Sequence, residues 1–447
     1  MRAPGWRQKS TAGLTATLIA LFAFAPSAAA QAPVRPDIVV DSMADAADSS
    51  AGNGVCRTSG GQCTVRAAIM EANALLGHDR IRIPAGTYEI EIPVLNEDFP
   101  STGDHDIVDG VTILGAGAGQ TTLDGGFPLP GQPVEARGID RIFEIHPSAA
   151  NVTIEQLTLQ EGYTDDSGAA ILNWSPGLLR LDRVHLLDNL SAKEGGAISN
   201  ADAFEYPWPA GSLPPTAAIP SGTIEIVDSK LAGNSAGSGG AAIHNVSEGT
   251  VSIIDSEVVD NPGLMIPDPL QIIDPLDPEP IEFIPGPGVY EPVASAIFNE
   301  GRFDEIGTVR VVDSTVARNY APPDGAGLHN DGDGTIEIAG STFEDNTSEG
   351  NGGAVYTNGG KVDVTDSEFA HNLAHANGGA FYSDGAISGV GLRSKVTITQ
   401  SSFDENEARA ESGAIHSDGD GEVFVTDVDV TQNEAVEDAG GGMSVHG

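Results

Sequence analysis

Short segments in which apolar and polar residues alternate recur along most of the chain. Ile336 and Ile338, like Val362 and Val364, are separated by a single polar residue. A period of two is typical of a β-strand with one buried face, whereas an amphipathic helix needs a period near 3.6. Six of these segments begin with Gly: 222–229, 249–256, 307–314, 334–341, 360–367 and 421–428.

Two short sequence motifs, called words below, recur at the same spacing as the alternating segments. The first resembles Asp-Ser-x-Phe-x-x-Asn and begins at residues 155, 182, 228, 255, 313, 340, 366, 400 and 427. Five of the eight spacings between these starts are 26 or 27 residues, and insertions lengthen the other three. The second word is Gly-Gly-Ala before an apolar residue, at Ile171, Ile198, Ile243, Ile297, Leu328, Val355, Phe381, Ile415 and Met443. The chain therefore repeats a unit of about 27 residues.

One unit is predicted to hold three short strands and three turns. A single coil cannot bury its inward side chains, but stacked coils can if each strand pairs with its equivalent in the next coil. The predicted fold class is all-β, a single-stranded parallel β-helix over residues 79–447 with insertions at 203–220 and 263–293. Two or three looser coils precede the clear repeats, within Ile81–Ile92, Val111–Leu123 and Ile142–Ile154. A leucine-rich repeat is excluded because its Leu-rich words are missing.

The N-terminal part has a different organisation. Residues 1–30 carry basic residues, an apolar stretch and Ala28-Ala29-Ala30, as in a secretory signal peptide. Residues 31–78 are predicted to cap the first coil, with a helix over Val65–Leu76 that Thr64 begins. Cys56 and Cys63 favour a disulfide in an exported protein, because two cysteines alone cannot complete a cysteine-only zinc site.

Two stretches of sequence resemble known bacterial families. CTVRAAI at 63–69, with Cys56 upstream and IPAGTY downstream, resembles the CSLREA-type region of exported β-helix proteins, although Thr64, Val65 and Ala67 depart from that motif. The Gly-Gly-Ala and Phe-x-x-Asn words resemble the passenger repeats of polymorphic outer-membrane proteins. The resemblance implies a right-handed, pectin-lyase-like β-helix that is secreted or lies on the cell surface. It implies no single chemistry, because this fold hosts many activities.

The end of the sequence raises an expectation about partners. The chain stops at GGGMSVHG, on the second word of a new coil. Surface-displayed relatives usually continue into a barrel or a sorting segment. We therefore expect either a truncated product or a partner chain that covers the last coil.

The charge narrows the range of ligands. The chain has 21 Lys+Arg and 65 Asp+Glu, a formal net charge of −44. Nucleic acid and anionic membranes attract basic surfaces, so neither is expected as a partner. No apolar run after the first 30 residues is long enough to span a bilayer. Acidic polysaccharides would be repelled unless a cation bridged the contact, which leaves carbohydrate or a surface protein as expected partners.

Acidic pairs are the first candidates for catalysis. Asp165 and Asp166 precede a Ser-Gly turn, and Asp104-His105-Asp106 is predicted to lie in a loop. Glycoside hydrolases use two carboxylates as acid and base, but one residue in seven here is acidic, so adjacent pairs also arise by chance. A uronate lyase would need Arg or Lys beside carboxylates, and the basic residues are scattered along the sequence.

Two turns are candidates for calcium. Asp331 and Asp333 in NDGDGT, and Asp418 and Asp420 in SDGDGE, place alternate carboxylates at a Gly turn. Neither stretch continues into an EF-hand, and a tight turn that needs Gly and tolerates Asp explains both equally well. No other cofactor is expected.

The insertions are the expected location of ligand contacts, since long loops on a regular scaffold often carry function. Their aromatic residues Tyr206, Trp208, Phe283 and Tyr290, if exposed, could stack on sugar rings or grip a protein. The alternative is that both insertions fold back on the β-helix.

These observations favour a non-catalytic, adhesin-like scaffold over a polysaccharide lyase or glycoside hydrolase on the same fold. An enzyme predicts carboxylates, or a carboxylate with Arg or Lys, that converge in one groove beside the insertions. A binding scaffold predicts acidic residues spread over every face. Asn346 and Asn372, one unit apart, are assigned to neither site: we expect them to stack as a hydrogen-bonded ladder.

Overall fold

The computed structural model describes residues 35–92, 101–126, 140–202, 206, 221–263, 271–273, 280–282, 294–301, 306–322, 324–385, 393–437 and 440–446. Residues 37–447 form one compact unit and the residues before it form another. Everything below concerns the larger unit. The predicted signal peptide lies outside the described residues.

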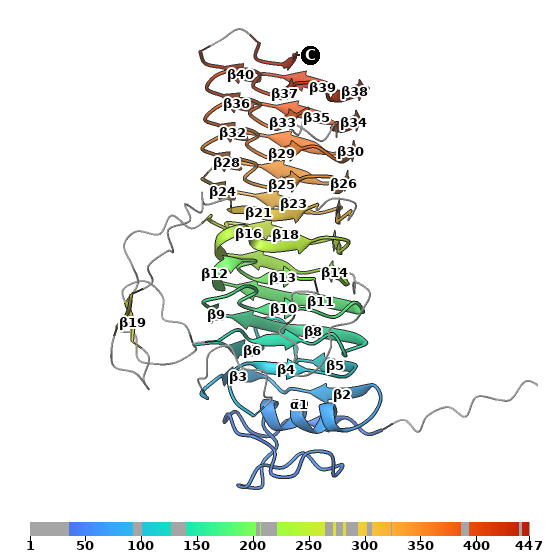
Figure 1. Cartoon of the computed structure of the whole chain (residues 1–447), viewed down its shortest axis with the longest axis vertical. Coiled ribbons are helices and arrows are strands. Elements are labelled where there is room, and N and C mark those ends of the chain that lie inside the picture. The colour runs from blue at the N-terminus through green and yellow to red at the C-terminus, as the bar shows by residue number, and fades with distance from the viewer. Residues whose placement is uncertain are drawn as a thin grey trace, which may run out of the picture. The chain divides into compact units, whose positions relative to one another are not determined.

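The larger unit is a parallel β-helix whose coils stack from the blue to the red end in Figure 1. Each strand pairs in parallel with its equivalent one coil further on: Ile336 of one strand lies beside Val362 of the next, and Val362 lies beside Val396. The only antiparallel ladder among the described strands joins β19 (Gln271–Ile273) to β20 (Pro280–Glu282). The predicted fold class is confirmed.

Four columns of equivalent strands make up the coils. The first column comprises β2 (Asp79–Arg82), β5 (Val111–Leu114), β8 (Asn151–Gln160), β11 (Leu178–Leu187), β14 (Thr223–Val227), β17 (Thr250–Ile254), β22 (Thr308–Val312), β26 (Thr335–Ala339), β30 (Lys361–Thr365), β34 (Lys395–Thr399) and β38 (Glu422–Thr426). The second column comprises β3 (Gly86–Glu89), β6 (Thr121–Asp124), the C-terminal halves of β8 and β11, β15 (Lys230–Ala232), β18 (Glu257–Val259), β23 (Thr315–Ala317), β27 (Thr342–Glu344), β31 (Glu368–Ala370), β35 (Ser402–Asp404) and β39 (Asp429–Thr431).

The third column forms most of a separate 13-stranded sheet. It comprises β4 (His105–Ile107), β7 (Phe143–Ile145), β10 (Ile171–Asn173), β13 (Ile198–Asn200), β16 (Ser235–Val246), β21 (Ala294–Glu300), β25 (Leu328–Asp331), β29 (Val355–Asn358), β33 (Phe381–Asp384), β37 (Ile415–Asp418) and β41 (Met443–Val445). The fourth column comprises the short strands β9 (Tyr163–Thr164), β12 (Leu190–Glu194), β24 (Tyr320–Ala321), β28 (Thr347–Ser348), β32 (Leu373–Ala374), β36 (Glu407–Ala408) and β40 (Glu434–Ala435). The fourth column was not predicted, because a two-residue strand is too short to show alternation.

Sharp bends separate the columns, and polar residues make them. A left-handed residue precedes the bend that follows a first-column strand, as Asp366 (φ 48°) does after β30. Another precedes the bend that follows a second-column strand, as Asp345 (φ 54°) does after β27. Asp and Asn tolerate this conformation better than most residues because their short side chains bond locally. The Asp-Ser and x-Asn steps of the repeat word therefore mark corners.

Apolar side chains from the strands of the first three columns fill the interior. Ile336, Phe343 and Val355 are fully buried and belong to one continuous core. Phe343, Phe369 and Phe403 stack in neighbouring coils, with ring centroids 5.1 and 4.7 Å apart. Burying a large side chain is worth about 1.5–3 kcal/mol, so each coil stabilises its neighbours through repeated apolar contacts.

An asparagine ladder runs along one corner, as predicted for Asn346 and Asn372. Each Asn donates from Nδ2 to Oδ1 of the equivalent residue in the next coil, over distances of 2.8–3.1 Å. The ladder joins Asn189, Asn234, Asn261, Asn319, Asn346, Asn372, Asn406 and Asn433. The Asn346 amide also donates to the Val316 carbonyl at 2.9 Å. The side chains thus satisfy backbone groups that the corner leaves unpaired.

A second asparagine ladder, which was not predicted, runs along the C-terminal ends of the strands in the third column. Asn173, Asn200, Asn245, Asn299 and Asn330 are fully buried, and each donates to the next at 2.8 Å. The sequence signal was present, because each Asn lies two residues after the apolar residue of the Gly-Gly-Ala word. It was hidden by the later coils, where Thr357 takes the place of Asn.

The N-terminal cap has the predicted parts, with one correction. Helix α1 (Val65–Ala74) is begun by Thr64, and the Cys56–Cys63 disulfide is present. The helix ends earlier than expected, so Leu76 is 89% exposed and does not join the apolar face. β1 (Ile38–Val39) pairs with β2, so the first rung begins inside the cap region. No described helix is long and apolar enough to cross a membrane.

The first ladder gives a stability prediction. Asn346→Ala should lower the free energy of unfolding by about 3 kcal/mol, because Asn319 then loses the acceptor for its backbone N–H and its amide. Urea unfolding followed by circular dichroism measures this loss. Asp345→Asn is the matched control: this neighbour is exposed and Asn keeps the left-handed backbone, so the change should stay within about 0.5 kcal/mol. Equal effects of the two substitutions would contradict the ladder.

Candidate functional site

The outer face of the 13-stranded sheet carries one side chain from each coil in a single column. From Glu144 to His416, each residue follows the buried apolar residue of its strand, so it points to the opposite face. The column runs through Asp106, Glu144, Leu172, Ser199, His244, Phe298, His329, Tyr356, Tyr382, His416 and Ser444, which are register partners in adjacent strands. Along the fold, this column of side chains changes from carboxylates in the first coils to aromatic rings in the later coils.

A groove of about 350 Å³ crosses this face in the middle coils. It is lined by residues of four coils: Asp166, Ser167, Leu172, Trp174, Lys193, Glu194, Ser199, Ala201, His244, Val246 and Glu300. The insertion at 203–220 begins directly after Asp202, and β21, which carries Glu300, follows the insertion at 263–293. The groove therefore lies beside the point where the chain leaves the coil for the first insertion, and it includes a residue of the strand that follows the second.

The polar side chains of the groove contact one another in pairs. The Lys193 ammonium lies 2.7 Å from Asp166, and the Ser167 hydroxyl donates to Glu194 at 2.7 Å. His244 Nε2 lies 3.2 Å from Glu300. Partial burial alone would lower the pKa of Lys193, but the hydrogen bond and charge of Asp166 outweigh it and raise the pKa. Lys193 therefore stays protonated at neutral pH and is unsuited to act as a general base.

A buried cluster of charged residues lies in the first coils of the same face. Asp104 and Asp106 are fully buried, and Arg141 and Glu144 are 3% exposed. Arg141 Nη1 pairs with Asp104 at 3.3 Å and also with Glu144. Burial raises the pKa of Asp104 well above its usual value, and the charge of Asp140 raises it further while Arg141 opposes both. The prediction of a loop at 104–106 was wrong: His105 and Asp106 belong to strand β4, and Asp104 directly precedes it.

Aromatic side chains connect this cluster to the groove. Trp174 Nε1 donates to Glu144 Oε1 at 3.0 Å, and Trp174 also lines the groove. Tyr206 lies edge-on to Trp174, with ring centroids 5.8 Å apart. Its hydroxyl lies 2.7 Å from His146 Nδ1, and His146 Nε2 lies 2.6 Å from Asp106. Groove wall and buried carboxylates thus form one continuous contact network.

At Tyr206 the structure agrees with the alternative in which the insertion folds back on the β-helix. The side chain is 9% exposed and packs with Leu172, Trp174 and Ala201, so it does not meet the condition of exposure for stacking on a ligand. An aromatic ring with a hydroxyl gains more by burying its faces and bonding to His146 than by remaining in water. Trp208, Phe283 and Tyr290 lie outside the described residues.

The catalytic candidates separate in the structure. Asp166 lines the groove and pairs with Lys193. Its neighbour Asp165 is not among the residues that line the groove. The sequence reasoning missed Glu194, Glu300 and His244, because an insertion or a coil boundary separates them from Asp166 along the chain.

The proposed calcium ligands fall in separate turns. Asp331 and Asp418 occupy equivalent places, but Asn358 and Asp384 lie between them in the ladder. Asp331 accepts hydrogen bonds from Gly332 and from Asn358, the latter at 3.1 Å. Asp418 accepts one from Tyr382 at 2.9 Å, and Asp420 lies 3.5 Å from Arg393. Gly332 and Gly419, next to Asp333 and Asp420, have φ of 68° and 70°, as the tight-turn alternative requires.

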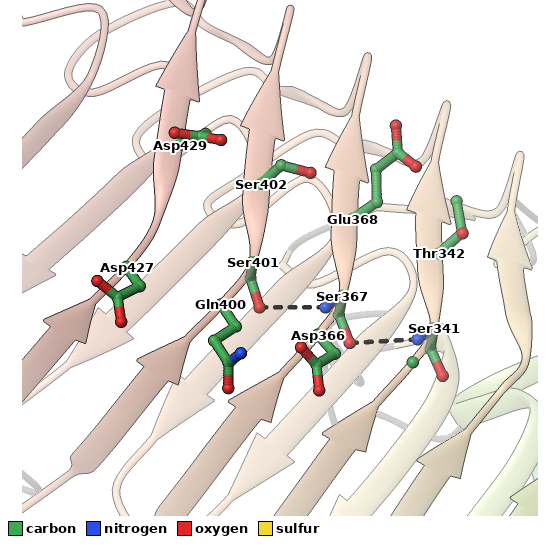
Figure 2. Close-up of a pocket in the computed structure, with 11 residues that line it drawn as sticks. Ser341, Thr342, Asp366, Ser367, Glu368, Gln400, Ser401, Ser402, Asp427 and Asp429 are labelled. Atoms are coloured by element: carbon green, nitrogen blue, oxygen red, sulfur yellow. Dashed lines mark hydrogen bonds between the residues drawn. The ribbon is translucent and has the colours of Figure 1, made fainter.

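A second, larger hollow of about 600 Å³ lies at the corner between the first two columns of the last coils (Figure 2). Asp366, Glu368, Asp427 and Asp429 line it, with Ser341, Ser367 and Ser401 along its floor. Each Ser hydroxyl accepts from the backbone N–H of the preceding coil's Ser, at 3.1–3.2 Å. These serines complete the corner, and none of the described residues that line the hollow is aromatic or basic. The groove at Trp174 is therefore the stronger candidate site.

Comparison with known proteins gives limited matches. The Chlamydia polymorphic membrane protein repeat matches residues 340–358. No curated protein sequence matches the chain. Two solved structures match over most of their length, both from Azotobacter vinelandii. The A-module of mannuronan C-5 epimerase AlgE6 is 14% identical, with a TM-score of 0.40, over 85% of this chain and 92% of that one. The A-module of AlgE4 is 15% identical, with a TM-score of 0.37, over 86% of this chain and 95% of that one.

The aromatic residues of this column of side chains lead to a prediction about how stability depends on pH. His329 lies between Phe298 and Tyr356, with ring centroids 4.8 and 4.6 Å away, and burial lowers its pKa to about 4. The unfolded chain binds this proton near pH 6.5, so between pH 6.5 and 4 the unfolded state holds more protons and stability falls as the pH falls. At pH 5 the loss due to His329 should be about 2 kcal/mol relative to pH 7.

His329→Phe keeps the ring and removes the titration. Urea unfolding at pH 7 and pH 5 should therefore show a smaller acid-induced loss for this variant than for the wild type. His371→Phe is the control, since His371 is exposed at the surface and its replacement should leave the loss unchanged. An identical pH dependence of wild type and His329→Phe would contradict the assignment.

Proposed function

We propose that the chain is an exported β-helix scaffold, secreted or on the cell surface, that binds a glycan in the groove beside Trp174. Two observations support the location. The first 30 residues have the pattern of a signal peptide, and residues 340–358 match a repeat of bacterial membrane proteins. The proposal of glycan binding rests on the residues that line the groove.

The composition of the groove supports a sugar ligand. It combines carboxylates of Asp166, Glu194 and Glu300 with the hydroxyls of Ser167 and Ser199 and the side chain of Trp174. Carboxylates accept hydrogen bonds from hydroxyl groups, and charge-assisted hydrogen bonds are the stronger ones. A few fixed polar groups beside an aromatic wall are typical of small-ligand sites.

The charge of the groove selects among glycans. Among the described residues of the groove, three carboxylates stand against one ammonium and one imidazole, and the whole chain carries a formal charge of −44. A polyuronate would be repelled by this surface, whereas a neutral glycan would not. We therefore propose a neutral, hydroxyl-rich glycan as the ligand class.

A glycoside hydrolase is the second candidate, because carboxylates and Lys193 converge in one groove, as expected of an enzyme on this fold. The raised pKa of Lys193 argues against a lyase that uses this lysine as its base. A hydrolase would instead use two of the three carboxylates as acid and base.

Glu194→Gln should weaken glycan binding about tenfold, because it keeps the side chain's shape and removes one charged acceptor. Binding is measured by calorimetry with the neutral oligosaccharide that scores highest on a glycan array. Glu337→Gln removes a carboxylate that pairs with Arg310 on a strand of another sheet, and it should leave binding unchanged.

The same samples separate the two candidates. Release of new reducing ends from the bound glycan by the wild type, lost in Glu194→Gln, would replace the binding scaffold with a hydrolase. Binding that both variants retain at wild-type strength would refute the groove as the site.

A further inference from the structure

Several carboxylates are buried close together in the first coils. Asp104, Asp106, Asp140 and Glu144 are each at least 97% buried, and Arg141 is the guanidinium that pairs with two of them. Arg66, the next buried guanidinium, pairs with Asp45 and donates to the carbonyls of Gly103 and Asp104. Uncompensated buried charge is costly, so such groups are usually paired or coordinate a metal.

Among the described residues, no hydrogen-bond donor reaches one oxygen atom of Asp104 and one of Asp106. They are Asp104 Oδ1 and Asp106 Oδ2, and both are inaccessible to solvent. The other oxygen of Asp104 faces Arg141, and the other oxygen of Asp106 contacts His146. Glu144 accepts from Trp174 through one oxygen and pairs with Arg141 through the other.

The spacing of the carboxylates suits a metal ion. One oxygen from each of Asp104, Asp106 and Glu144 lies within 4.8 Å of the others. Two ligands that each lie roughly 2.4 Å from a calcium ion can be no more than about 4.8 Å apart. The backbone supports the arrangement, because Asp106 and Glu144 are register partners in adjacent strands.

We propose that Asp104, Asp106 and Glu144 bind a divalent cation, of which calcium fits best. All three ligands are hard carboxylate oxygens, which excludes the softer metals that select thiolates. Calcium accepts irregular coordination and carboxylates that keep other hydrogen bonds, whereas magnesium demands near-ideal octahedral geometry. This site is distinct from the glycan groove and does not depend on the proposed ligand.

The cation would also fix the groove wall. Glu144 holds the Trp174 indole N–H at 3.0 Å, and Trp174 lines the groove. The indole also gives a direct readout, since it lies one hydrogen bond from a proposed ligand. The chain has three Trp, at positions 6, 174 and 208, so Trp6→Phe with Trp208→Phe leaves Trp174 alone.

The test is terbium luminescence on the full chain carrying these two Phe substitutions, after treatment with a chelator. Excitation of Trp174 should sensitise terbium emission, and added calcium should displace it. Saturating calcium should also raise the Tm by several degrees, because a ligand of the native state stabilises it.

Asp104→Asn with Asp106→Asn should reduce terbium affinity by about tenfold or more and abolish the calcium-dependent rise in Tm. Asp366→Asn with Asp427→Asn removes the same charge from the exposed hollow of Figure 2 and should change neither result. If the first double variant does not fold, Asp106→Asn alone replaces it.

Two outcomes would overturn the proposal. One is a chelator-treated wild type whose Tm and terbium emission do not respond to the ions. The other is an equal response of both double variants, which would assign the emission to the acidic surface in general.

Discussion

Parallel backbone pairing between equivalent strands of adjacent coils is the constraint on which the whole structure depends. It fixes every position of one coil opposite the same position of the next, as Ile336 lies opposite Val362. Any residue type repeated at one position therefore becomes a continuous column. Apolar residues become the core, Asn becomes a ladder at the corners, and the residues after each buried apolar position become the face that carries the groove.

The corners show how this constraint limits the sequence. A bend in each coil leaves backbone groups without strand partners, and these groups are buried when the coils stack. Asn346 solves the problem with one side chain, which donates to Val316 and Asn372 and accepts from Asn319. Ser341 and Ser367 do the same at the neighbouring corner (Figure 2). Much of the polar repetition in this chain is therefore structural.

Both proposed sites lie where the repetition breaks. The coils beside the two insertions differ in length, and β16 runs unbroken from the fourth column into the third. Asp166, Glu194 and Glu300 come from three of these irregular coils and line one groove. The first coils break the pattern in another way, since Asp106 and Glu144 stand where later coils carry aromatic rings. Both proposed sites lie on one face because the same column of side chains, from Asp106 to Ser444, runs through them.

The sequence by itself determined the β-helix, its unit of about 27 residues, the capping helix, the disulfide and the ladder of Asn346 and Asn372. It could do so because each of these features depends on local alternation, on spacing or on repetition at a fixed period. Only the tertiary structure decided that Tyr206 is buried against Trp174, that Asp166 meets Glu194 and Glu300, and that Asp104 and Asp106 lie beside Glu144. These contacts join residues separated by insertions of irregular length, and no period in the sequence records which coil then lies beside which.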